Sequence, residues 1–165
     1  MDLTLLDRLS TLEERVDKLE KQLLHSPPSL VEGLPDIISP INNNPELPDG
    51  AVTFGGSVAV GKQIATYQWA RPTHWITDNT WEEQIGRIAA LAHPVRGEIL
   101  RYVLCDPATA AKLVSAGVVS SMGTAYHHLN ELQAGGWVTK ANGAYSVPPS
   151  RVIALMTIIT AAEAH

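Results

Sequence analysis

The stretch over residues 91–147 most constrains the fold, because it carries helix start signals and turn signals in a fixed order. Pro94 suits the first turn of a helix, where the N–H that proline lacks has no partner in any case. Asp106-Pro107 repeats this start and predicts a second helix over residues 107–115. These signals predict two successive helices, one that begins at Pro94 and one that begins after Asp106.

A third helix and a hairpin follow. Gly117 supplies a turn, and Ser120 or Ser121 is placed to cap a helix whose inner face carries Ala125, Leu129 and Leu132. Gly135-Gly136 ends that helix. Asn142-Gly143, the preferred pair for a type I′ turn, then lies between two short strand-like runs. Helix, helix-turn-helix and two-stranded wing is the order of a winged helix, so we predict a mainly α fold with a small β part (α+β).

Helices are also expected on both sides of this core. Thr80-Trp-Glu-Glu83 has the pattern of a capping box and predicts a helix start ahead of Ile85 and Ile88. After Pro148-Pro149 comes a helix that is apolar nearly all round, which does not suit the surface of a monomer. We expect this last helix to form a dimer contact through Ile153, Met156 and Ile159.

The N-terminal residues repeat apolar side chains at steps of four and three, as in a coiled-coil seam. Positions a hold Leu9, Val16 and Leu23, and positions d hold Leu5, Leu12 and Leu19. The alternative is one amphipathic helix packed on its own domain. Three heptads are marginal alone, so a second dimer contact is expected elsewhere.

Between the two ends, a Pro- and Asn-rich linker over residues 26–50 is expected to be semi-extended. A three-stranded β-meander is predicted next, with turns at Gly55-Gly56 and Gly61-Lys62. The predicted organisation is a coiled-coil helix (1–25), the linker (26–50), the meander segment (51–79) and the winged-helix domain (80–165).

Four aromatic residues gather around the end of this segment. Tyr67 and Trp69 share one strand face, and Trp75 and Trp81 follow at six-residue intervals. They form a candidate pocket for a planar organic effector, because aromatic walls suit such ligands. The alternative is that they seal the strands to the helices.

Bulk composition limits the possible functions. The formal net charge of -5 and a pI near 5.6 mean that the whole chain does not attract phosphate backbones. One cysteine, Cys105, excludes an internal disulfide framework. No apolar stretch reaches the roughly 20 residues that span a bilayer. We therefore expect a cytoplasmic protein with no membrane partner. Sequence motifs for catalysis are absent, so an enzyme is not expected.

Residues 85–159 resemble the ArsR/SmtB-type winged-helix regulators, and within them an actinobacterial-style subgroup with an N-terminal extension. The resemblance covers just under half of the chain. The matching residues are Ile88-Ala-Ala-Leu-Ala-His-Pro-Val-Arg96, Ile99-Leu100, Ala111, Leu113, Thr124, His128-Leu129, Leu132 and Gly136-Trp137-Val138. It implies a homodimer that represses transcription by binding double-stranded DNA and is released by a signal.

The metal site of that family is not expected here. Its metal-sensing members carry paired thiolates, whereas this chain has only Cys105, which cannot build a closed tetrahedral site. His127 and His128 are neighbours on a helix and point about 100° apart. A ligand set borrowed across a dimer with His165 is the alternative. No cofactor and no metal are predicted.

The predicted recognition helix contains no Lys or Arg, although arginine to guanine is the commonest specific contact. Between Trp81 and His165, six basic residues balance six acidic ones. The candidate DNA contacts are Ser121, Met122, Thr124, Tyr126, His127 and Asn130 on the helix, with Lys112, Lys140 and Asn142 nearby. The alternative function is a winged-helix dimer that no longer binds DNA and serves as a protein-interaction or small-ligand receptor module. Its working surfaces would be the coiled coil and the tryptophan-bearing strand segment, and an exposed Tyr126-His127-His128 cluster favours it.

Overall fold

The computed structural model describes residues 8–16 and 36–164. The chain divides into two compact units, one made of Met1–Ser39 with Ala164–His165 and the other of Pro40–Glu163. Within the first, residues 8–16 form a helix, as the heptad pattern predicts, and Leu9, Leu12 and Val16 are exposed on it. The other predicted seam residues, Leu5, Leu19 and Leu23, and also His165, lie outside the described residues.

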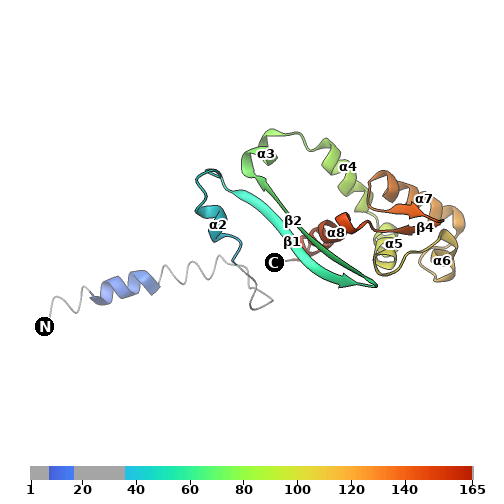
Figure 1. The fold of residues 1–165 in the computed structure, drawn as a ribbon, viewed down its shortest axis with the longest axis horizontal. Coiled ribbons are helices and arrows are strands. Elements are labelled where there is room, and N and C mark those ends of the chain that lie inside the picture. Colours follow the sequence, from blue (N-terminus) through green and yellow to red (C-terminus); the bar gives the residue numbers. More distant parts are fainter. Residues whose placement is uncertain (1–7, 17–35, 165) are drawn as a thin grey trace. The chain divides into compact units, whose positions relative to one another are not determined.

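Figure 1 shows the order of elements from residue 39 onward. The short helix α2 comes first, then a long hairpin, five helices, a short hairpin and a final helix. The elements are α2 (Ser39–Asn42), β1 (Ala51–Val60), β2 (Gln63–Pro72), α3 (Thr73–Asp78), α4 (Glu82–Leu91), α5 (Pro94–Cys105), α6 (Ala110–Ser115), α7 (Met122–Ala134), β3 (Thr139–Ala141), β4 (Ala144–Ser146) and α8 (Pro149–Ala161). Among the described residues, no helix is long and apolar enough to cross a bilayer.

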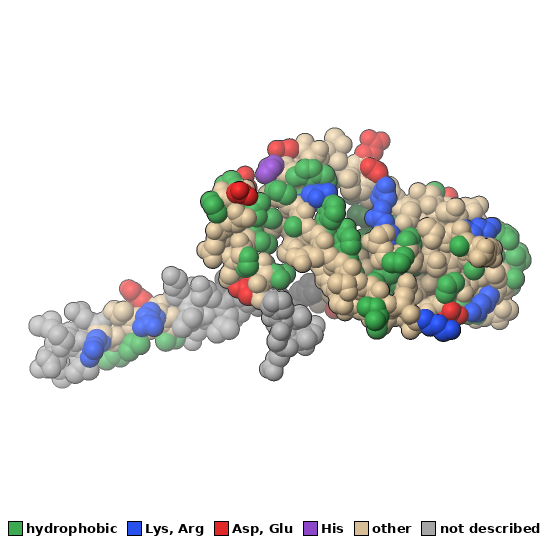
Figure 2. All heavy atoms as spheres, viewed as in Figure 1, with side chains coloured by type: hydrophobic (Ala, Val, Ile, Leu, Met, Phe, Trp, Pro, Cys, Tyr) green, Lys and Arg blue, Asp and Glu red, His purple; other side chains and the backbone are tan. Residues whose placement is uncertain are grey.

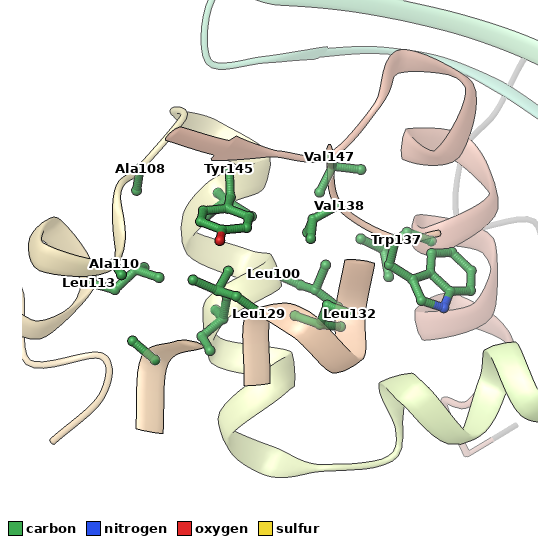
Figure 3. Packing of buried hydrophobic residues seen from close by; sticks show 14 of the residues in the cluster. Leu100, Ala108, Ala110, Leu113, Leu129, Leu132, Trp137, Val138, Tyr145 and Val147 are labelled. Atoms are coloured by element: carbon green, nitrogen blue, oxygen red, sulfur yellow. The ribbon is translucent and has the colours of Figure 1, made fainter. Parts of the chain in front are cut away.

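The predicted winged helix is confirmed. α6 and α7 pack on each other as the helix-turn-helix, and α7 also packs on α5. β3 and β4 form the antiparallel wing, and an isolated bridge from Ala108 to Tyr145 adds a third short strand. Figure 3 shows the Tyr145 ring pointing from the wing into the core, among apolar side chains that include Leu129 and Leu132 of α7. This packing anchors the wing beside α7.

Two helix starts differ from prediction. α6 begins at Ala110, and its cap is Thr109, whose hydroxyl accepts from the Lys112 amide at 3.1 Å; Asp106-Pro107 lies before the helix. α4 begins at Glu82 after Trp81, without a side-chain cap, so the predicted capping box at Thr80 does not form. In contrast, one of the two predicted caps of α7 is confirmed: it is Ser121, whose Oγ accepts from the Thr124 amide at 3.1 Å.

The predicted three-stranded meander is wrong. β1 and β2 are ten-residue strands in one antiparallel hairpin that turns at Gly61-Lys62, and Gly55-Gly56 lies inside β1. A Cβ on Gly56 would lie 3.5 Å from the Ile153 side chain of α8, and one on Gly55 would lie 3.1 Å from the Tyr67 carbonyl oxygen. Gly55 therefore serves a close approach of β2, Gly56 would make only ordinary contact with Ile153, and neither glycine forms a turn.

This hairpin also explains the apolar last helix. α8 packs on both hairpin strands, and Val152 and Leu155 join the winged-helix core. Ile153 is buried against the hairpin of its own chain, which removes it from the predicted dimer contact. Met156 is half-buried, and Ile159 is 61% exposed, so these two residues stay available to a partner.

Residues 36–50 of the predicted linker are more folded than expected. The Asp36 carboxylate accepts from the amides of Ile38 and Ser39, and the short helix α2 follows. Three consecutive turns then lead to Gly50, whose carbonyl oxygen accepts from the Thr73 amide at 3.0 Å. Local side-chain caps and turns thus replace a semi-extended path.

Candidate nucleic-acid interface

The outer face of α7 is uncharged and accessible. Met122, Tyr126, His127 and Asn130 are exposed along it, while Ala125 and Leu129 are buried on the opposite side. This split follows from the helical period, which places residues three and four apart on one face. Four of the predicted helix residues thus share one surface.

The other two predicted contacts on the helix, Ser121 and Thr124, lie at the N-terminal end of α7. Ser121 is occupied by its capping bond, and the Thr124 hydroxyl lies 2.9 Å from the Ser121 Oγ, so Thr124 is half-buried beside the cap. In the structure both hydroxyls fix the start of α7. The sequence pattern alone could not distinguish this capping role from contact with a nucleic acid.

The wing lies next to this face. The Lys140 Nζ is 6.0 Å from the centre of the Tyr126 ring and 5.2 Å from that of Tyr145, so strand β3 brings a cation beside α7. Asn142 and Gly143 both have positive φ, at 50° and 80°, as a type I′ turn requires. The structure thus brings Lys140 together with Tyr126 and places Asn142 at the exposed wing tip.

Lys112 stands in a different environment. Its Nζ donates to the Asp106 carboxylate at 2.9 Å, and both side chains are exposed. This hydrogen bond, with the charge attraction, lowers the pKa of Asp106 below its ordinary value and raises the pKa of Lys112. Because Asp106 already balances its charge, Lys112 is less available to a phosphate than Lys140, the other lysine among the predicted DNA contacts.

Three histidines meet where α7 approaches the start of α5. The His128 ring lies 4.6 Å from the His93 ring and 5.0 Å from the His127 ring, centre to centre. The predicted exposure of His128 is wrong: it is buried, because it faces α5 rather than solvent. Among the residues that the structure describes, its Nδ1 has no hydrogen-bond partner. Burial first, then the charges of His93, His127 and Arg96, lower the pKa of His128.

His93 has a structural role. It caps α5, its Nδ1 accepting from the Val95 amide at 3.2 Å, as a residue before Pro94 is placed to do. Within residues 8–16 and 36–164, no three His, Cys, Asp or Glu side chains are grouped so that they could hold a metal ion.

Charge is sparse around the interface. α7 carries one charged residue, Glu131, whose carboxylate lies 3.8 Å from an Arg96 nitrogen. On the face seen in Figure 2, basic side chains lie scattered among acidic and apolar ones and form no continuous stripe. Any duplex contact on this surface therefore depends more on uncharged groups than on cations.

The four predicted effector residues divide between two hollows. Tyr67, Trp69 and Trp75 line a cavity of about 430 Å³ at the hairpin. Trp81 lines a smaller neighbouring one with Trp75, and its indole N–H donates to the Ile76 carbonyl at 2.7 Å, which ties α3 to the start of α4. Sequence analysis missed Arg71 and Arg151, which line the larger cavity. Arg71 lies between Trp69 and Trp75 in the sequence, which was a signal, whereas nothing near Arg151 in the sequence pointed to the cavity.

Comparison with known proteins yields little. No protein-family model matches the chain. No curated protein matches it. Among solved structures, the chain is similar to reduced HlyU from Vibrio cholerae N16961, with 20% sequence identity and a TM-score of 0.42, over 56% of this chain and 99% of that one. The description of this fold therefore depends on the elements and contacts given above.

Proposed function

We propose that this chain is a homodimeric DNA-binding transcription regulator, a repressor of the ArsR-like winged-helix class that lacks a classical metal site. One observation carries the proposal: α7 presents Tyr126, His127 and Asn130 on one exposed face, with Lys140 of the wing beside it. A helix of this kind enters the major groove while the wing contacts the neighbouring backbone.

Each side chain has a role suited to its chemistry. The Asn130 amide pairs with adenine, and Tyr126 donates to a phosphate or approaches a base edge. Lys140 contacts backbone phosphate, and Asn142 reaches it from the wing tip. Met122 at the helix start supplies an apolar contact to a thymine methyl group.

The two-fold pairing proposed for this regulator has two candidate contacts. Leu9, Leu12 and Val16 are exposed on the N-terminal helix. In the second unit, a mostly apolar groove of about 590 Å³ runs between α5 and α8 and is lined by Met156 and Ile159. A second copy would cover both apolar surfaces, as closed two-fold dimers do.

Selection from a random duplex library, with the full chain at low salt, tests the DNA-binding proposal. We expect enrichment of a two-fold symmetric site, because a dimer presents two α7 helices. Binding by fluorescence anisotropy should then weaken with salt at a slope of about -2 to -4, since few cations meet phosphate. Asn130→Ala should reduce affinity about tenfold. Gln68→Ala, an exposed amide on β2, serves as the matched control.

The absence of Lys and Arg from α7, together with the Asp106–Lys112 pair, favours a second candidate. In this case the winged helix has lost DNA binding and serves as a protein-interaction or ligand-receptor module. Failure to enrich any duplex above the level of an unrelated acidic protein would favour this module. A two-fold site whose affinity depends on Asn130 would exclude it.

A further inference from the structure

The cavity beside the long hairpin combines aromatic walls with positive charge. It has a volume of about 430 Å³ and lies between β1, β2, α3, α4 and the start of α8. Its lining includes Phe54, Tyr67, Trp69, Trp75, Arg71 and Arg151. None of its lining residues is acidic. A volume of this order accommodates a small organic molecule.

Arg71 is held at this cavity with most of its donors unused. Its guanidinium carbon lies 4.1 Å from the centre of the Trp69 ring and 4.5 Å from that of Trp75. Among the described residues, Nη1 donates to the Ala70 carbonyl at 3.3 Å, and the buried Nε has no partner. A guanidinium carries five N–H donors in one plane, so this group can still bind an acceptor.

Arg151 brings a second cation to the same lining. Its guanidinium carbon lies 5.5 Å from the centre of the ring of Trp137, a residue that does not line this cavity. Within the described part of the chain, no carboxylate pairs with Arg151 or with Arg71. Arg151 stands in the first turn of α8, where the helix dipole adds partial positive charge. Two partly desolvated cations without a counter-ion favour an anionic guest.

The aromatic walls set the shape of that guest. The Tyr67 and Trp69 rings are nearly parallel, with an interplanar angle of 11° and centres 6.0 Å apart, and both belong to β2. The β-strand period places these two residues on one face of the hairpin. The Arg71 guanidinium covers one face of Trp69, so Tyr67 and the neighbouring Phe54 supply the aromatic surface against which a planar ring system packs.

We propose that this cavity binds a planar aromatic carboxylate. Its carboxylate pairs with Arg71, Arg151 supplies a second positive charge from the same lining, and its ring system packs on Phe54 and Tyr67. Arginine suits this role because its planar fork matches the two carboxylate oxygens. The site is one of binding alone, and it stands independently of whether α7 contacts DNA.

Titration of the full-length protein with 2-naphthoate and with 2-naphthamide, followed by calorimetry, tests the proposal. The two probes share a ring system and differ in charge. We expect naphthoate to bind at least tenfold more tightly than naphthamide. Arg71→Gln and Arg151→Gln should each weaken naphthoate binding roughly tenfold and change naphthamide binding less than twofold. Arg101→Gln, which removes an exposed arginine of α5 outside this cavity, should leave both affinities unchanged.

Gln84→Glu provides a test that leaves both arginines in place. Gln84 is exposed on α4 and lines the cavity, so a carboxylate there should weaken naphthoate binding and spare naphthamide. Thermal unfolding of each variant confirms that it is folded. The proposal would be overturned if the two probes bound with equal affinity or if naphthoate did not bind. It would also be overturned if naphthoate binding were the same in Gln84→Glu and in every arginine variant that folds.

Discussion

Gly61 closes the β1–β2 hairpin directly against the end of α5. Its φ is +58°, and a Cβ built on it would lie 1.8 Å from the Cys105 carbonyl oxygen. Nearby, the Gln63 side-chain amide donates to the Leu104 carbonyl at 3.4 Å. One residue without a side chain therefore decides whether the hairpin tip can approach the helix.

Gly61→Ala should lower the free energy of unfolding by about 2–4 kcal/mol, because it adds backbone strain to a steric clash with backbone atoms. Gly117→Ala is the matched control. Gly117 also has a positive φ, +72°, but nothing lies within 4 Å of its added Cβ. Urea unfolding of both variants separates the two effects. Equal losses of stability would contradict the packing described at Cys105.

His128 links stability to pH. Its pKa is lowered in the folded chain, mainly by burial and also by His93, His127 and Arg96, while Glu131 opposes them. The unfolded chain therefore binds a proton at His128 more readily than the folded chain. Stability from the neutral ring is full above about pH 6.5, falls as the pH drops below that value, and levels off once the folded pKa is passed.

His128→Gln should therefore flatten the loss of stability between pH 7.5 and pH 5. Urea unfolding at several pH values measures this slope. His74→Gln, a change at an exposed histidine near the start of α3, should keep the wild-type slope. A wild-type slope retained in His128→Gln would show that other groups cause the pH dependence.

The start of α7 is held by a side-chain cap. The Ser121 Oγ satisfies the Thr124 amide, one of the N–H groups that a helix leaves without a partner. Since this turn presents Met122 and leads to Tyr126, the cap also positions the proposed DNA-contacting face.

Ser121→Ala should destabilise the folded chain by about 1 kcal/mol, measured by urea unfolding. Ser120→Ala, at an exposed serine one residue earlier that does not cap the helix, should change stability little. If the two substitutions had the same effect, Ser121 would not be the functional cap.

At the scale of the whole molecule, self-association determines whether two α7 helices act together. Leu12 is 54% exposed on the N-terminal helix and occupies a seam position of the predicted coiled coil. A charge there would have to be buried in a dimer seam, which is unfavourable without a partner.

Leu12→Glu should weaken dimerisation at least tenfold in sedimentation equilibrium of the full chain. Ser10→Glu places the same charge on the same helix, at a position outside the seam, and should leave the association constant within about twofold. A monomeric wild-type protein, or equal effects of the two substitutions, would contradict the coiled-coil prediction.

Local signals in the sequence determined the winged helix and most of its candidate interface. The Ser121 cap, the Asn142-Gly143 turn and the period of Ala125, Leu129 and Leu132 depend on neighbours a few residues away, and the structure contains all of them. Short-range hydrogen bonds and steric limits act in the same way whatever the rest of the chain does.

Tertiary structure alone decided the rest, because those features depend on residues far apart in the chain. Gly55-Gly56 stays within a strand because β1 pairs with β2 along its whole length, and α8, almost a hundred residues later, packs on this hairpin. The same distant packing buries Ile153 and brings Arg71 and Arg151 to one cavity. Local propensity carries no information about such contacts, since packing against a distant element creates them.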